Sequence, residues 1–109
     1  MKNQPDAWRE LKSWFEKQFG MESNVDAMLF LVGVQQLGKG FEEFEKSQKL
    51  DLIHVGVCTI LEGDYYRLLK RDKEDWPHFE LIKKLPVMNA KQQDDFIKKY
   101  LLAYFKEYQ

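Results

Sequence analysis

One short stretch of the sequence carries side chains that could do chemistry together. Asp51, His54 and Cys58 follow one another at spacings of three and four residues, which places them on one surface of a helix. A carboxylate can orient and charge a histidine, and an imidazolium can lower the pKa of a neighbouring thiol, as a cysteine nucleophile requires. One hypothesis is therefore a small enzyme that uses this polar stripe.

A structural role for the stripe is favoured over a catalytic one. A single helix supplies no oxyanion donor and no second element for a substrate, and cysteine is a common core residue. With His78 as a third ligand the stripe could begin a zinc site. A structural zinc takes four ligands, however, and the chain has two histidines and one cysteine. We expect no metal and no cofactor, with Cys58 packed and His54 hydrogen-bonded near the rim of the core.

Two aromatic features indicate binding surfaces. An exposed Trp76 and His78 beside Pro77 could form a binding lip, although a tryptophan before proline more often anchors a turn to the core. Tyr100, Tyr104 and Tyr108 form a ladder at spacings of four residues on the last predicted helix. Exposed aromatic surface commonly marks an interface, and symmetric dimers are the commonest assembly. We expect a homo-oligomer or a protein partner at these positions.

Length and charge restrict the class of protein. A chain of 109 residues is expected to form a single domain over 1–109. Its net charge of −1 argues against non-specific nucleic-acid binding, which depends on neutralising phosphates. The single cysteine cannot form an internal disulfide, the N-terminus has no signal-peptide pattern, and no apolar run approaches the roughly 20 residues of a membrane span. We expect a soluble, cytoplasmic protein with no nucleic-acid or membrane partner.

The elements that position these residues are mostly helical. The apolar spacing predicts four helices, at about 5–19, 24–37, 47–62 and 89–108. The stretch 64–85 favours a short β-hairpin, with a helix followed by a loop as the alternative.

Particular residues are predicted to bound and orient these helices. Ser23 is predicted to cap the second helix, and Asn89 with Gln92 the fourth. On the third helix, Leu50 belongs to the stripe that is expected to face the core. Gly38-Lys39-Gly40 is predicted to be a turn; a helix-turn-helix DNA-binding element around it is a third, lower-ranked hypothesis because acidic residues follow it.

The run from Asp51-Leu52-Ile53-His54-Val55 to Cys58, together with Tyr65-Tyr66 and Trp76-Pro77-His78, resembles a family of short bacterial proteins of the Bacteroidetes type. The likeness spans most of the chain from about Leu29 onward. The resemblance implies a bacterial cytoplasmic protein and carries no activity, cofactor or partner.

The sequence therefore predicts a mainly α, small four-helix domain with a short β-hairpin before the last helix. The expected function is a non-enzymatic protein-interaction module that self-associates through aromatic helix faces. The alternative is a small enzyme or metal-binding protein that uses the stripe of Asp51, His54 and Cys58.

Overall fold

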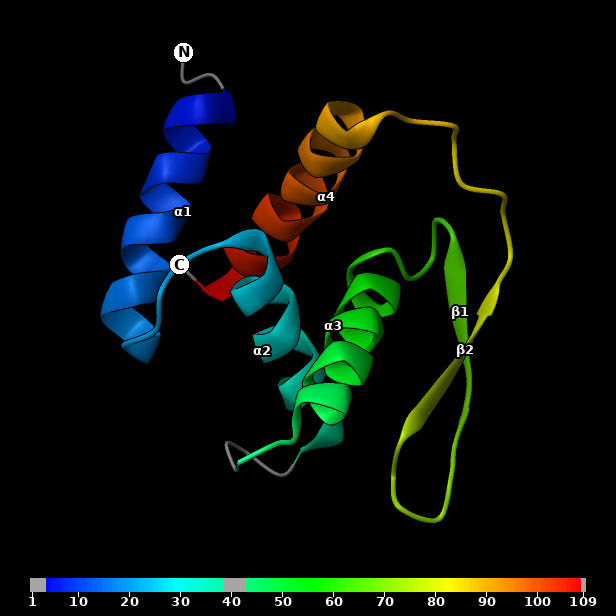
Figure 1. The fold of residues 1–109 in the computed structure, drawn as a ribbon. Coiled ribbons are helices and arrows are strands. Elements are labelled where there is room, and N and C mark those ends of the chain that lie inside the picture. Colours follow the sequence, from blue (N-terminus) through cyan, green and yellow to red (C-terminus); the bar gives the residue numbers. More distant parts are fainter. Residues whose placement is uncertain (1–3, 39–42, 109) are drawn as a thin grey trace. The chain divides into compact units, whose positions relative to one another are not determined.

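The computed structural model describes residues 4–38 and 43–108. It contains four helices and an antiparallel β-hairpin between the third and the fourth (Figure 1), which confirms the predicted mainly α fold. In chain order the elements are α1 Gln4–Phe19, α2 Val25–Leu37, α3 Lys46–Ile60, β1 Tyr66–Arg71, β2 Pro77–Leu81, α4 Ala90–Phe105 and the 3-10 helix η1 Lys106–Tyr108. The alternative of a helix and a loop over 64–85 is wrong.

The chain divides into two compact units, and the border between them falls inside α2. The first unit combines residues 1–28 with residues 88–109, and the second spans residues 29–87. A single domain over 1–109 stays a prediction. The predicted turn at 38–40 extends beyond the described residues, because only Gly38 of its three residues is described.

The helix starts confirm one predicted cap and correct another. The Asn89 side chain accepts a hydrogen bond from the Gln92 N–H at 2.8 Å, and the Gln92 side chain accepts one from the Asn89 N–H at 3.0 Å. At the start of α2 the cap is Asn24, whose Oδ1 accepts from the Ala27 N–H at 2.7 Å. The prediction of Ser23 is wrong because its hydroxyl donates instead to the Glu16 carboxylate.

Aromatic packing joins α1 to α4 in the first unit. Phe15 and Phe105 are fully buried, and their ring centroids lie 6.0 Å apart. The Trp14 ring lies 5.9 Å from Phe105. The aromatic side chains of α1 therefore meet the buried face of α4, which carries Leu101 and Phe105.

Two glycines bring α2 and α3 into backbone contact in the second unit. A Cβ atom on Gly33 would lie 2.1 Å from the carbonyl oxygen of Leu52, and one on Gly56 would lie 2.1 Å from that of Leu29. This contact explains why the prediction that Leu50 faces the core is wrong. The Leu52 and Gly56 side of the helix faces α2, and Leu50 is consequently 60% exposed.

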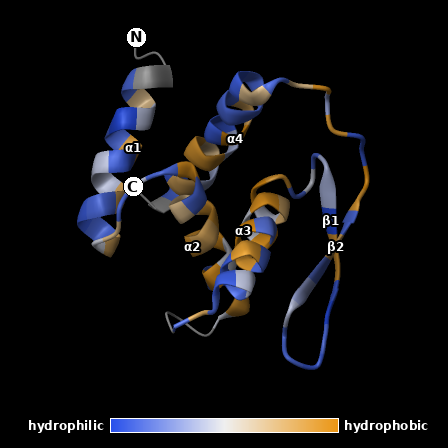
Figure 2. Ribbon diagram, in the orientation of Figure 1, coloured by the Kyte–Doolittle hydropathy of each residue, from blue (hydrophilic) through white to orange (hydrophobic). Residues whose placement is uncertain are grey.

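The hairpin belongs to this second unit and has a polar turn. Tyr66 pairs with Leu81 and Leu68 with Phe79, and the register shifts by a bulge between Leu68 and Lys70. Figure 2 shows the hydrophilic residues of the turn between β1 and β2, in contrast to the largely hydrophobic α2.

Arg71 connects the hairpin to the end of α2. Its Nη1 donates to the Gln36 carbonyl oxygen at 2.7 Å, and its Nη2 donates to the Gln36 side-chain oxygen at 3.2 Å. Carbonyl oxygens in the last turn of a helix lack intrahelical donors and carry partial negative charge. A guanidinium group is therefore well suited to this position.

None of the described helices has the length and apolar character needed to cross a membrane.

Candidate functional site

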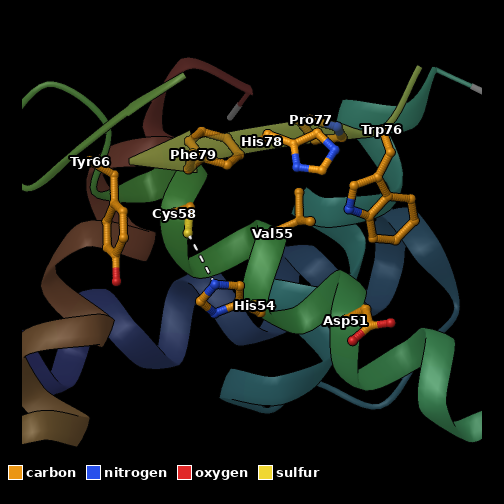
Figure 3. Close-up of a pocket in the computed structure, with 9 residues that line it drawn as sticks. All are labelled: Asp51, His54, Val55, Cys58, Tyr66, Trp76, Pro77, His78 and Phe79. Atoms are coloured by element: carbon orange, nitrogen blue, oxygen red, sulfur yellow. Dashed lines mark hydrogen bonds between the residues drawn. The ribbon is translucent and has the colours of Figure 1, made fainter. Parts of the chain in front are cut away.

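A pocket of about 460 Å³ lies between α3 and the hairpin, entirely within the second unit. Figure 3 shows the hairpin residues above and the α3 residues below. The pocket brings together the two clusters that the sequence singled out, the polar stripe of α3 and the Trp76–His78 segment. Its lining comprises Asp51, His54, Val55, Cys58, Tyr66, Trp76, Pro77, His78 and Phe79.

A catalytic role for the polar stripe requires a contact of His54 with Cys58 and one of Asp51 with His54. Only the first of these is formed. The His54 Nε2 atom lies 3.6 Å from the Cys58 Sγ atom, one helical turn away. Within the described residues the Asp51 carboxylate has no hydrogen-bond or ion-pair partner, so it does not orient His54. The three residues share one helix face, as predicted, without forming a relay.

Cys58 is not activated by its surroundings. Its side chain is buried, with 1% of its surface exposed. Burial raises the pKa of the thiol from 9.0 to about 11, because a thiolate loses hydration in an apolar environment. Burial also raises the pKa of the Tyr66 phenol, and the proximity of Cys58 adds to this effect. Both groups therefore carry their protons at neutral pH.

Trp76 packs against the core, as the second of the two interpretations expected, and it also lines the pocket. The ring is half-buried and packs against a core cluster of Val34, Leu37 and Leu52. It also lines the pocket, where Figure 3 shows the indole above the part of α3 that carries Asp51. Packing against the core therefore helps to hold this residue of the pocket wall in place.

His78 is held by an aspartate that the sequence analysis missed. Its Nε2 atom lies 3.0 Å from Asp72 Oδ2. The other carboxylate oxygen of Asp72 accepts from the backbone N–H groups of Glu74 and Trp76, at 2.9 and 3.0 Å. The hydrogen bond to His78, followed by that from Trp76, lowers the pKa of the Asp72 carboxyl. One carboxylate thus orders the turn and orients a pocket residue.

Tyr66 and Phe79 also line the pocket without having been predicted as site residues. Tyr66 could have been identified from the alternation of side chains along β1, because Tyr66 and Leu68 share one face of the strand. The position of Phe79 in the pocket depends on the register of the two strands, in which it pairs directly with Leu68. That register could be assigned only after the bulge near Lys70 was known.

The predicted interface on α4 lies apart from this pocket, in the first unit. The Tyr100 ring is 5.1 Å from that of Phe96, and the Tyr104 ring is 5.2 Å from that of Phe105. Both tyrosines are half-buried, and the side chain of Tyr108 is outside the described set. Association through these residues stays a prediction.

No three or more His, Cys, Asp or Glu side chains are arranged to hold a metal ion among residues 4–38 and 43–108. Comparison of the chain with protein-family models, with curated proteins and with solved structures gives no match. The resemblance to a Bacteroidetes-type family therefore stays a prediction, and the geometry of the pocket carries the functional argument.

Proposed function

We propose that this chain is a non-enzymatic binding module that holds a small ligand in the pocket between α3 and the hairpin. One observation carries the proposal. Residues 51–58 and 66–79 are separated in the sequence, yet their aromatic and polar side chains line the same cavity. A cavity of about 460 Å³ with aromatic walls and a few polar groups has the usual size and character of a small-molecule site.

The chemistry of the pocket favours binding over catalysis. A nucleophilic cysteine needs a substantial thiolate fraction, and the pKa of Cys58 near 11 leaves its thiol protonated at neutral pH. The Tyr66 phenol can instead donate a hydrogen bond. Trp76 and Phe79 offer flat apolar surface beside it.

A second hollow, in the first unit, is less suited to a ligand. It has a volume of about 470 Å³, and Trp8, Asp94 and Lys98 contribute to its lining. The Lys98 ammonium lies 2.8 Å from the Asp94 carboxylate and 5.1 Å from the centre of the Trp8 ring. Two of its charged groups, Lys98 and Asp94, are therefore occupied by one another.

The proposal predicts where ligands bind. We expect a screen of small aromatic and amine compounds against ¹⁵N-labelled protein to shift the amide signals of residues 51–58 and 76–79. Signals of α1 and α4 should stay in place. The His54→Trp variant should abolish these shifts, because the larger ring fills the pocket from an exposed position on α3.

Lys49→Trp is the matched control, since it places the same ring at an exposed α3 position outside the pocket. It should bind the same compounds as the unmodified chain. Three results contradict the proposal: no compound shifts the pocket signals, the shifts occur only in α1 and α4, or His54→Trp binds unchanged.

A further inference from the structure

Resting on the proposed function, we infer that the pocket selects a small organic cation, with an ammonium group on a compact apolar body. The first argument is charge. Asp51 is an acidic residue of the lining, and none of the described lining residues is a lysine or an arginine. A second carboxylate, that of Asp72, is not part of the lining but lies 3.0 Å from His78, which is. Lys70 pairs with His78 across the hairpin but is exposed and does not line this pocket.

The state of the Asp51 carboxylate is the second argument. Asp95 is an exposed acidic residue that has a cationic neighbour in the chain, the Lys91 ammonium at 3.1 Å. Asp51 has no such partner in the part of the chain that is described. A cationic ligand in the pocket would supply the missing opposite charge, whereas an anionic ligand would be repelled.

Aromatic surface provides the third argument. An ammonium group is attracted to the face of an aromatic ring, most strongly to that of tryptophan. This chain makes such contacts itself, with the Lys83 ammonium 5.1 Å from the centre of the Tyr65 ring. In Figure 3, Trp76 lies above the part of α3 that carries Asp51, and the carboxylate and the indole both line the cavity.

Choline and 3,3-dimethylbutan-1-ol provide the test, because the two compounds have the same shape and differ in charge. Each is titrated into the full ¹⁵N-labelled chain while the amide signals of residues 51–58 and 76–79 are followed. We expect choline to bind at least tenfold more tightly than the neutral alcohol. Asp51→Asn should weaken choline binding about tenfold and leave that of the alcohol unchanged.

Glu74→Gln is the control for net charge, because it removes an equal charge from an exposed hairpin residue outside this pocket. It should bind choline as the unmodified chain does. Equal binding of the two compounds, unchanged choline binding by Asp51→Asn, or no choline binding overturns the inference. Binding of other compounds in the ligand screen would then leave the proposed function intact, whereas a screen without any pocket ligand would remove both.

Discussion

The Cys58 thiol of the folded protein is expected to react with iodoacetamide at least about 100-fold more slowly than the same thiol in the urea-unfolded chain. Its pKa rises from 9.0 to about 11, and below pH 9 the thiolate population falls tenfold for each pH unit by which the pKa rises. Burial of the side chain slows access further. The measurement is the pseudo-first-order alkylation rate at pH 8, followed by mass spectrometry.

His54→Ala is the informative comparison for this experiment. The His54 ring is 3.6 Å from the sulfur, so an activating histidine would make the unmodified chain react faster than the variant. We expect the two folded proteins to react at similar slow rates. A folded thiol that reacts as fast as the unfolded control, and loses that rate without His54, would favour the enzyme hypothesis over the binding module.

Ionisation of the Cys58 thiol makes the free energy of unfolding depend on pH. The folded state holds the Cys58 proton up to a pH of about 11, whereas the ordinary thiol loses its proton near pH 9.0. Its contribution is therefore complete below pH 9 and declines as the pH rises to about 11, by up to about 3 kcal/mol. Denaturant unfolding of Cys58→Ala should lack this component of the alkaline decline.

Replacing Gly33 or Gly56 with alanine is expected to destabilise the protein by about 3 kcal/mol, at the upper end of the cost of overpacking. The new methyl group would meet a carbonyl oxygen of the facing helix at 2.1 Å in either variant. Backbone atoms cannot rotate away as a flexible side chain can, so α2 and α3 must separate. Urea unfolding followed by circular dichroism measures the loss.

The sign of the change in unfolding free energy distinguishes the effect of helix packing from that of helix propensity. Alanine is favoured over glycine in a helix by about 1 kcal/mol, so these variants would be stabilised if the two helices were not in contact. Lys49→Ala, at an exposed position on α3, should stay within about 0.5 kcal/mol of the unmodified chain. Increased stability of both glycine variants would contradict the observed helix contact.

Local sequence signals predicted the elements well, because their causes lie within a few residues. Asn89 and Gln92 form their cap from side chains three positions apart, and Pro77 excludes a continuous helix through the hairpin. The start of α2 was misassigned by one residue, since Ser23 and Asn24 are both good caps. Only the bond from Ser23 to Glu16 distinguishes them.

Local sequence signals could not predict which side of α3 faces the core. Apolar residues occur on more than one side of this helix, so periodicity alone did not separate the Leu50 side from the Leu52 side. Gly33 and Gly56 contained the missing information. A glycine inside a helix carries an energetic cost that close packing can explain, and here each one faces the backbone of the other helix.

The candidate site was predicted as parts and not as a whole. The stripe of Asp51, His54 and Cys58 and the segment at Trp76 and His78 were each identified from local patterns. Their meeting in one pocket depends on the hairpin register and on long-range contacts such as that of Arg71 with Gln36. No pattern within a single segment encodes these contacts.

Closure of the hairpin over α3 is the premise of both the proposed function and the inferred ligand class. The most direct test is a nuclear Overhauser measurement on the free protein, with labelled leucine methyl groups and a labelled Trp76 ring. The packing of Trp76 against the cluster of Val34, Leu37 and Leu52 predicts strong cross-peaks between the indole protons and methyl groups of this cluster. An indole with cross-peaks only to residues of the hairpin itself would contradict the pocket.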